Sequence, residues 1–258
     1  MRGQPLSLMK LSAVIITFNE ERNLKRCIDS LREVADEIIV VDSFSQDGTQ
    51  RIAEAAGARF IQHPFEGHIQ QKNIALSHAQ HEWILSLDAD EALDETLRAS
   101  IVAIKQSGDA AGYSMNRLTN YCGHWVRYCG WYPDTKVRLI RNGKGSWTGV
   151  NPHDRLDLLT GAKPAHLEGD ILHYSYYTLD DHRKQIEYFG DIAARELFAR
   201  KKNITWPMLI AKVFAQFIKS YIIKLGVLDG SAGWTISRMS AYATWRKYTK
   251  LKTLYRNA

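Results

Sequence analysis

Over its first hundred residues the chain alternates short apolar runs with segments of helical character. The runs are rich in β-branched residues, which is typical of buried strands. They cover residues 11–18, 38–41, 58–62 and 83–87. The segments between them predict helices at about residues 20–31, 51–56, 68–79 and 94–105, with Asn19 as the first N-cap. Strands alternating with helices predict a mainly parallel central sheet flanked by helices, which is the α/β class.

From residue 112 the pattern changes. Residues 112–118 and 136–142 predict antiparallel strands, separated by a loop at 121–133 that is rich in Tyr, Trp and Gly. A further strand is expected at 170–176 and a polar helix at 179–202. The second half of the chain therefore does not continue the alternation of strand and helix.

The end of the chain is apolar on a helical period. Apolar residues recur at spacings of three and four over residues 206–225, with lysines on the other side. Gly226 marks the expected end of this helix, and a second helix is predicted at about residues 232–251.

Charge is divided unevenly along the 258 residues. Residues 1–199 carry 22 Lys and Arg against 27 Asp and Glu, whereas residues 200–258 carry 12 against a single acid, Asp229. A basic amphipathic helix with aromatic residues suits an anionic lipid surface. The alternatives are packing on the rest of the chain or against another copy, which would make a homo-oligomer. No nucleic acid partner is expected, because aromatic and basic residues lie on separate faces.

Cysteine content and hydropathy indicate the compartment. Three cysteines without metal-ligand spacing favour a reducing environment. The first ten residues are too short and polar for a secretory signal, and no stretch reaches the ~18 apolar residues of a membrane-spanning helix. We therefore expect a cytoplasmic protein.

Polar residues collect where the predicted strands end. Asn19 and Asp42 follow the first two strands, and Asp88 and Asp90 follow the fourth. Because ligands bind at the carboxyl ends of parallel strands, this D-x-D pair suits a site for Mg²⁺ or Mn²⁺ and a diphosphate. The alternative is a solvated capping loop, with Asp94 as the N-cap of the next helix. Neither a G-x-G-x-x-G nor a P-loop motif occurs, which disfavours dinucleotide oxidoreductases and P-loop NTPases.

Several segments together resemble a known family. VIITFNEERNLKRCIDSL, EIIVVDSFSQDGT, QQKNIAL and WILSLDADE, in this order and spacing, resemble family 2 glycosyltransferases of the GT-A fold. The later segments WYPDTKVRLIRNGKGSWTG, NPHDRL, ILHYSYY and GVLDGSAGW resemble the bacterial enzymes that add glucose to the inner-core heptose of lipopolysaccharide.

The resemblance implies a domain plan and an activity. A GT-A catalytic domain would cover residues 1–203, with the nucleotide-binding part at about 11–110 and the acceptor part at about 111–203. A basic amphipathic helical extension would follow at 204–258. The implied enzyme is an inverting, metal-dependent hexosyltransferase, with UDP-glucose the favoured nucleotide-sugar donor and a lipid-linked saccharide, the lipopolysaccharide inner core, the favoured acceptor. It would be peripheral on the cytoplasmic face of the inner membrane.

The resemblance also assigns residues to the site. The nucleotide-sugar would be bound by Thr17, Asn19, Glu20, Asp42, Asp47, Lys72, Asn73 and Asp88. The divalent cation, Mg²⁺ or Mn²⁺, would be held by Asp90, with Asp88 and His173 beside it. Asp154, which follows His153 where relatives commonly carry Glu, would be the catalytic base. The alternatives are a surface loop acid for Asp154 and a buried structural histidine for His173.

The acceptor would be met by the middle loop and the strand after it. The candidates are Trp131, Tyr132, Asp134 and Arg138, since aromatic faces stack on sugars and Arg binds phosphates. Simple packing and a solvated basic face are the alternatives. For the whole chain the alternatives are another nucleotide-sugar donor, a polyprenyl phosphate acceptor, or a catalytically silent carbohydrate- or lipid-binding protein. A nucleotidyltransferase would carry a glycine-rich basic loop after the first strand, and TFNEERNL is not one.

Overall fold

The computed structural model describes residues 9–108, 110–150, 153–159 and 161–257, which form two compact units. The first, here called the sheet unit, comprises Met1–Arg117 and Asp134–His173. The second, here called the helical unit, comprises Leu118–Pro133 and Tyr174–Ala258. This division differs from the boundary expected after residue 203. The long helix before that point packs against the last helix, so it belongs to the helical unit.

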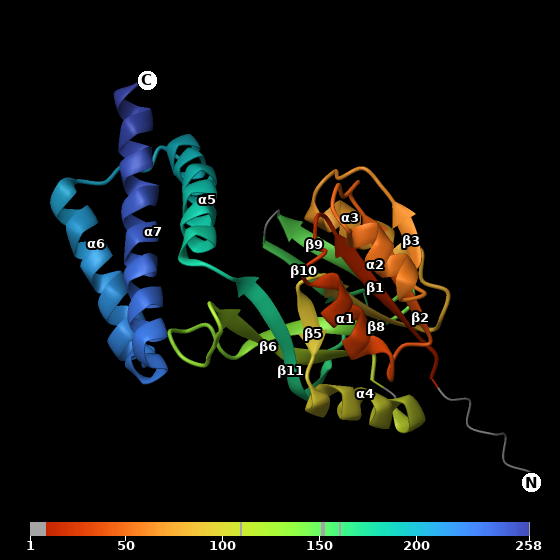
Figure 1. The fold of residues 1–258 in the computed structure, drawn as a ribbon. Helices are drawn as coiled ribbons and strands as arrows, with labels where there is room; N and C mark the ends of the chain where they lie inside the picture. Colours follow the sequence, from red (N-terminus) through yellow and green to blue (C-terminus); the bar gives the residue numbers. More distant parts are fainter. Residues whose placement is uncertain (1–8, 109, 151–152, 160, 258) are drawn as a thin grey trace, which may run out of the picture. The chain divides into compact units, whose positions relative to one another are not determined.

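Half of the central sheet is parallel. Its strands are β1 (Leu11–Thr17), β2 (Glu37–Asp42), β3 (Arg59–Gln62) and β4 (Trp83–Asp88), in the order β3-β2-β1-β4 (Figure 1). The connections hold α1 (Leu24–Leu31), α2 (Thr49–Ala55) and α3 (His68–Ser77). Every pair in this half is parallel, as the alternation of strands and helices predicts.

The other half of the sheet is antiparallel. Beyond β4 the order continues β8 (Asp134–Arg141), β6 (Gly112–Tyr121), β11 (Ala165–Tyr176) and β5 (Glu91–Leu93). The short β7 (His124–Val126) pairs with β6, α4 (Glu95–Ser107) follows β5, and β9 (Gly145–Val150) with β10 (His153–Leu158) forms a separate antiparallel pair. The α/β class is confirmed. The sheet is mixed and not mainly parallel as expected, because β5 and the strands after residue 112 join it.

Apolar residues cover both faces of the parallel strands. In β1, Leu11, Ala13 and Ile15 pack with α1, whereas Val14 joins the opposite cluster with Ile39 and Trp147. Because successive side chains on a strand point to opposite faces, burial on both faces requires a continuous apolar run. This is the physical origin of the run at residues 11–18.

Two predicted helix caps have different outcomes. Asp94 caps α4, since its carboxylate accepts a hydrogen bond from the Leu97 amide at 2.7 Å. Asn19 does not cap α1, which begins only at Leu24. Asn19 instead adopts a left-handed backbone with φ 54°, which Asn tolerates better than most residues. The chain therefore turns sharply at the end of β1 before the helix starts.

The helical unit contains α5 (Leu179–Ala199), α6 (Trp206–Ile218) and α7 (Gly230–Arg256), with α5 and α6 on either side of α7 (Figure 1). The predicted helix at 206–225 is shorter than expected. It passes into a π-turn, η1 (Lys219–Ile223), and a 3₁₀ turn, η2 (Gly226–Asp229). The change of direction depends on a close approach of two glycines, because a Cβ on Gly233 would lie 1.7 Å from the Gly226 carbonyl oxygen.

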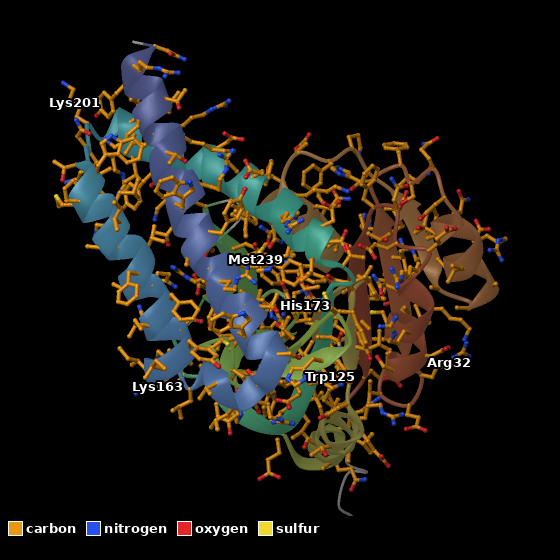
Figure 2. The ribbon with its side chains drawn as sticks, turned by 60° about the vertical axis from the view of Figure 1, so that its left-hand side comes forward. Arg32, Trp125, Lys163, His173, Lys201 and Met239 are labelled. Carbon is orange, nitrogen blue, oxygen red and sulfur yellow. The ribbon has the colours of Figure 1, made fainter. Side chains whose placement is uncertain are left out.

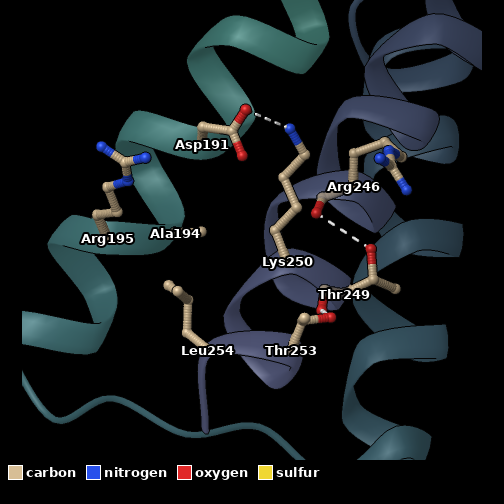
Figure 3. A pocket seen from close by; sticks show the side chains of 8 residues that line it. All are labelled: Asp191, Ala194, Arg195, Arg246, Thr249, Lys250, Thr253 and Leu254. Atoms are coloured by element: carbon tan, nitrogen blue, oxygen red, sulfur yellow. Dashed lines mark hydrogen bonds and ion pairs between the residues drawn. The ribbon is translucent and has the colours of Figure 1, made fainter. Parts of the chain in front are cut away.

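Ion pairs hold α5 against α7. Arg246 donates two hydrogen bonds to Glu187, at 2.6 and 2.7 Å. The Lys250 Nζ lies 2.7 Å from Asp191 (Figure 3). Hydrogen bonds from Arg246 and Lys250 lower the pKa of Glu187 to about 2. A hollow of about 350 Å³ lies beside these groups. Two basic residues that line this hollow, Arg246 and Lys250, already form ion pairs with Glu187 and Asp191. Within the described residues no helix is long and apolar enough to cross a membrane.

Candidate active site

The register of the parallel strands brings three candidate residues to one edge of the sheet. Thr17 at the end of β1 pairs with Asp42 at the end of β2, and Ile16 pairs with Asp88 at the end of β4. The side chains of Thr17 and Asp42 are buried. Thr17 Oγ1 is buried and has no hydrogen-bond partner among the described residues.

Two loops beside these strand ends are tied together by hydrogen bonds. The Asn19 side-chain oxygen accepts from the Gln46 amide at 2.8 Å, and Asp42 accepts from the Ser45 amide at 2.8 Å. Asp47 accepts from the amides of Thr49 and Glu21, at 3.0 and 3.1 Å. Asn19, Asp42 and Asp47 therefore shape the edge of the site. Their contact with a nucleoside stays a prediction.

Glu20 lies in the same region with an altered acidity. Burial is the main cause that raises its pKa, and the charges of Asp90, Asp47 and Asp88 raise it further. A hydrogen bond from Asn23 to the Glu20 Oε2, at 2.8 Å, acts in the opposite direction. Acidic groups thus concentrate negative charge at this edge, which favours a cation or hydrogen-bond donors in a ligand.

Lys72 on α3 connects the strand end to the β9–β10 pair. Its Nζ lies 3.0 Å from Asp88 and 2.8 Å from Asp154 on β10. The Lys72 side chain is only 6% exposed, and its Nζ lies 4.2 Å from the centre of the Trp147 ring. A single buried ammonium therefore joins the first Asp of the D-x-D pair to the predicted base.

A second set of charges surrounds Asp88 on its other side. Arg138, 2% exposed, donates to Glu91 at 2.7 Å and lies 3.5 Å from Asp88. Arg117 pairs with Glu91 at 3.3 Å and with Asp134 at 2.8 Å. Burial acts to raise the pKa of Asp88, but the charges of Lys72 and Arg138 outweigh it and hold that pKa well below its usual range. Asp88 is therefore an ionised carboxylate in this structure.

These contacts include residues that sequence reasoning missed. Glu91 follows the D-x-D pair directly and is fully buried, and its Oε2 accepts from the Asp88 amide at 3.1 Å. Trp147 lies beneath both Lys72 and Arg138, with the Arg138 Cζ 5.0 Å from its ring centre. The one local signal for Glu91 is that it directly follows the D-x-D pair in the sequence DADE. No local pattern marks Trp147 or Arg117.

Asn73 on α3 forms hydrogen bonds with the backbone of β9. Its amide donates to the Trp147 carbonyl oxygen and accepts from the Trp147 amide, both at 2.9 Å. This two-way bond holds β9 against α3 and thereby holds Trp147 near Lys72. A direct contact between Asn73 and a nucleotide stays a prediction.

Asp90 and His173 lie next to each other. The His173 Nε2 is 3.2 Å from an Asp90 carboxylate oxygen, and the buried His173 Nδ1 has no hydrogen-bond partner among the described residues. In the described part of the chain no group of three or more His, Cys, Asp or Glu residues is arranged to hold a metal ion. One carboxylate and one imidazole nevertheless fit a divalent cation that takes its remaining ligands from a diphosphate and water. Asp88 is engaged by Lys72 and Arg138, so its part in metal binding stays a prediction.

The four acceptor candidates divide between the two units. Arg138 and Asp134 take part in the charge network of the sheet unit. Trp131 and Tyr132 belong to the helical unit, where Trp131 packs edge-on against Tyr121 at 5.7 Å between ring centres. The Arg127 guanidinium lies 5.5 Å from the Tyr132 ring centre. Packing thus accounts for Trp131, and stacking of either ring on an acceptor sugar stays a prediction.

Residues 12–151 match the family model of glycosyl transferase family 2, which covers more than half of the chain. The chain belongs to glycosyltransferase family 2. This glycosyltransferase is 37% identical to the lipopolysaccharide core biosynthesis glycosyltransferase LpsC of Rhizobium meliloti, over 83% of this chain and 81% of LpsC. It is 28% identical to an uncharacterized glycosyltransferase of Rickettsia typhi, over 96% of this chain and 88% of that protein.

Among solved structures, this family 2 glycosyltransferase is similar to glucosyl-3-phosphoglycerate synthase from Mycobacterium tuberculosis in complex with Mn²⁺, UDP and glucosyl-3-phosphoglycerate. The TM-score is 0.37 at 23% identity, over 43% of this chain and 44% of that one. The chemistry of the candidate site therefore rests on this chain's own residues. They are an ionised carboxylate at Asp88, a buried cation at Lys72, and a second carboxylate at Asp154 within reach of the same cation.

Proposed function

We propose that the enzyme is an inverting, metal-dependent glycosyltransferase that moves glucose from UDP-glucose to a saccharide of a lipid-linked acceptor, the inner core of lipopolysaccharide. The relationship to LpsC supports the acceptor class. The donor and its inversion rest on the resemblance of the strand-end motifs. The three residues that lie closest together, Asp88, Lys72 and Asp154, support the reaction type.

The observation that carries the proposal is the Lys72 bridge. Asp154 and Asp88 lie 66 residues apart in the sequence, yet both carboxylates lie within 3.0 Å of one ammonium group. An inverting transfer needs a base on the acceptor side and charge neutralisation on the diphosphate side, at a separation of a few ångströms. The bridge supplies a carboxylate for the acceptor side, Asp154, and a cation for the diphosphate side, Lys72, 2.8 Å apart.

The residues would share the reaction as follows. Asp154 accepts the proton of the acceptor hydroxyl as its oxygen forms a bond to the anomeric carbon. The bond from that carbon to the diphosphate oxygen breaks on the opposite face, and the electron pair leaves with UDP. Lys72 and Arg138 stabilise the negative charge of the leaving diphosphate. Asp90 and His173 would hold the divalent cation, which supplies further charge neutralisation when bound.

We also propose that the enzyme acts as a peripheral protein on the cytoplasmic face of the inner membrane. The support is the excess of Lys and Arg over residues 200–258, where Asp229 is the single acid. Anionic lipids attract such segments. A lipid-linked acceptor would be met at this surface.

A donor panel tests the function. Purified enzyme is titrated calorimetrically with UDP-glucose, UDP-galactose, GDP-mannose and ADP-glucose, with and without Mn²⁺ or Mg²⁺. Binding of one nucleotide-sugar only in the presence of metal, followed by its transfer to a deacylated inner-core saccharide, is the expected result. Absence of binding to the whole panel, by protein with a native circular dichroism spectrum, contradicts the proposal and favours a silent binding protein.

A further inference from the structure

Large apolar side chains of α6 and of the two turns after it are exposed. Ile210, Phe214 and Ile223 are 60, 67 and 67% exposed. The exposed set continues along α6, η1 and η2 with Met208, Ile222, Leu225, Val227 and Leu228. We call these residues together the α6 surface. Trp206 is left out because its ring packs against Trp245 of α7. Figure 2 shows side chains projecting outward from α6.

Other side chains of α6 already pack against α7. Leu209 is fully buried, and Phe217 lies edge-on against Trp234 of α7 at 5.2 Å between ring centres. Because an α-helix turns by about 100° per residue, Phe214 projects about 140° around the helix from Leu209, so α7 can cover Leu209 and leave Phe214 exposed. An apolar helix face is normally covered by another part of the protein or by a partner. Among the described residues the α6 surface remains exposed to solvent.

The charge around the α6 surface is of one sign. Exposed lysines flank it at Lys201, Lys202, Lys212, Lys219 and Lys224, with Lys201 at the turn between α5 and α6 (Figure 2). No Asp or Glu occurs between Glu196 and Asp229. Asp229 offers no exposed negative charge, since it is buried and accepts from the amides of Arg127 and Tyr128.

This combination distinguishes between possible occupants. A second copy of the chain would bring the same lysines to a symmetric interface, where like charges repel. An anionic bilayer provides acyl chains for the apolar residues and phosphates for the lysines at the boundary between them. The charge complementarity therefore favours lipid.

We propose that the α6 surface inserts into the headgroup and acyl boundary of an anionic bilayer, with α6 lying in the membrane plane. This inference deepens the proposed function and rests on it for its purpose, because an enzyme acting on a lipid-linked acceptor gains from being held at the lipid surface. The physical argument for insertion depends only on the exposed apolar residues and their lysines.

Vesicle co-sedimentation of the full chain, without substrates, tests the insertion. Wild-type protein should bind vesicles of phosphatidylethanolamine and phosphatidylglycerol more tightly than vesicles of phosphatidylcholine. A triple variant, Ile210→Asn, Phe214→Asn and Ile223→Asn, should bind the anionic vesicles about 1000-fold more weakly, at roughly tenfold per inserted side chain. Tyr188→Asn is the matched control. Tyr188 is 64% exposed on α5, across α7 from α6, and should leave binding unchanged.

A second variant tests the charge. Replacing Lys212 and Lys219 with Gln should weaken binding to anionic vesicles by roughly fivefold for each lysine, and the loss should shrink at high salt. Binding of the triple variant equal to that of wild type, or no binding of wild type to anionic vesicles, overturns the proposal. A concentration-dependent dimer that the triple variant abolishes would assign the α6 surface to a second copy instead.

Transfer to a water-soluble, deacylated acceptor separates this proposal from the proposed function. The triple variant should keep that activity within about twofold of wild type, because its substitutions are exposed residues of the helical unit. If wild type binds vesicles but transfers no sugar to any acceptor, the proposed function fails and membrane docking stands. If sugar is transferred but vesicles are not bound, docking fails and the function stands.

Discussion

Asp154→Asn is the sharpest test of the candidate base. Asn is nearly the same size as Asp and its oxygen can still accept a hydrogen bond from Lys72, but it cannot take the acceptor's proton. General base catalysis contributes typically about 10²–10⁴-fold, so the rate of transfer should fall by about 10³-fold, or about 4 kcal/mol in barrier height. Donor affinity should change little, because the base acts on the acceptor.

The cost to stability follows from the Lys72 bridge. Breaking a fully buried ion pair costs roughly 3–5 kcal/mol because it leaves an uncompensated charge. In Asp154→Asn, Lys72 keeps its pair with Asp88 at 3.0 Å, so we expect a smaller loss of about 1–2 kcal/mol. The melting temperature of the variant therefore has to be measured beside its activity.

Asp157→Asn is the matched control. Asp157 lies on the same strand, β10, but it pairs with Arg155 at 2.8 Å and with the Thr148 hydroxyl. Steady-state rates at saturating donor, with donor affinity measured by calorimetry, compare the two variants. If Asp154→Asn transfers sugar within about threefold of Asp157→Asn, Asp154 is not the base. If donor affinity and rate fall together, Asp154 acts in the donor site instead.

The remaining predictions concern the cation, pH and backbone packing. Asp90→Asn should abolish the dependence of donor binding on Mn²⁺, measured by calorimetry; a metal response equal to that of wild type would remove Asp90 from the cation site. Burial lowers the pKa of His182 to about 4 from 6.5, so the unfolded state binds the proton first. Stability should therefore fall by roughly 3 kcal/mol as pH drops from 6.5 to 4, and denaturant melts of His182→Gln should show a flatter pH profile. Gly233→Ala should destabilise the protein by about 1–3 kcal/mol because the new Cβ would collide with the Gly226 carbonyl oxygen. Gly190→Ala, within α5, would meet only the Lys250 side chain at ordinary contact distances and should stabilise the protein by about 0.5–1 kcal/mol. Equal melting temperatures for the two glycine variants would contradict the packing argument.

The sequence alone determined the parallel half of the sheet and the location of the site. The strands that form at residues 11–18 and 83–87 are buried on both faces, so each reads as a continuous apolar run. Such a run can be recognised without knowing which segments pack against it. The ends of these runs had to carry the polar residues, because the chain leaves the core there. The positions of Asp42 and Asp88 at one edge of the sheet therefore follow from the apolar runs that precede them.

Only the tertiary structure decided which charges meet. Lys72, Asp88 and Asp154 come from α3, β4 and β10, and no local pattern connects them. Glu91 is an acid that local rules would place in solvent, yet Arg138 and Arg117 stabilise it in full burial. Pairings of this kind depend on how distant segments pack, which periodicity does not report.

The C-terminal helices show the same division. The spacing of apolar residues over 206–225 determined that a helix forms, because that pattern is local. It could not determine where the helix ends or which side is covered. The close approach of Gly226 and Gly233 turns the chain at η2, and α7 then covers Leu209 and leaves Phe214 exposed. Both outcomes are decided by contacts between segments, which the local pattern does not contain.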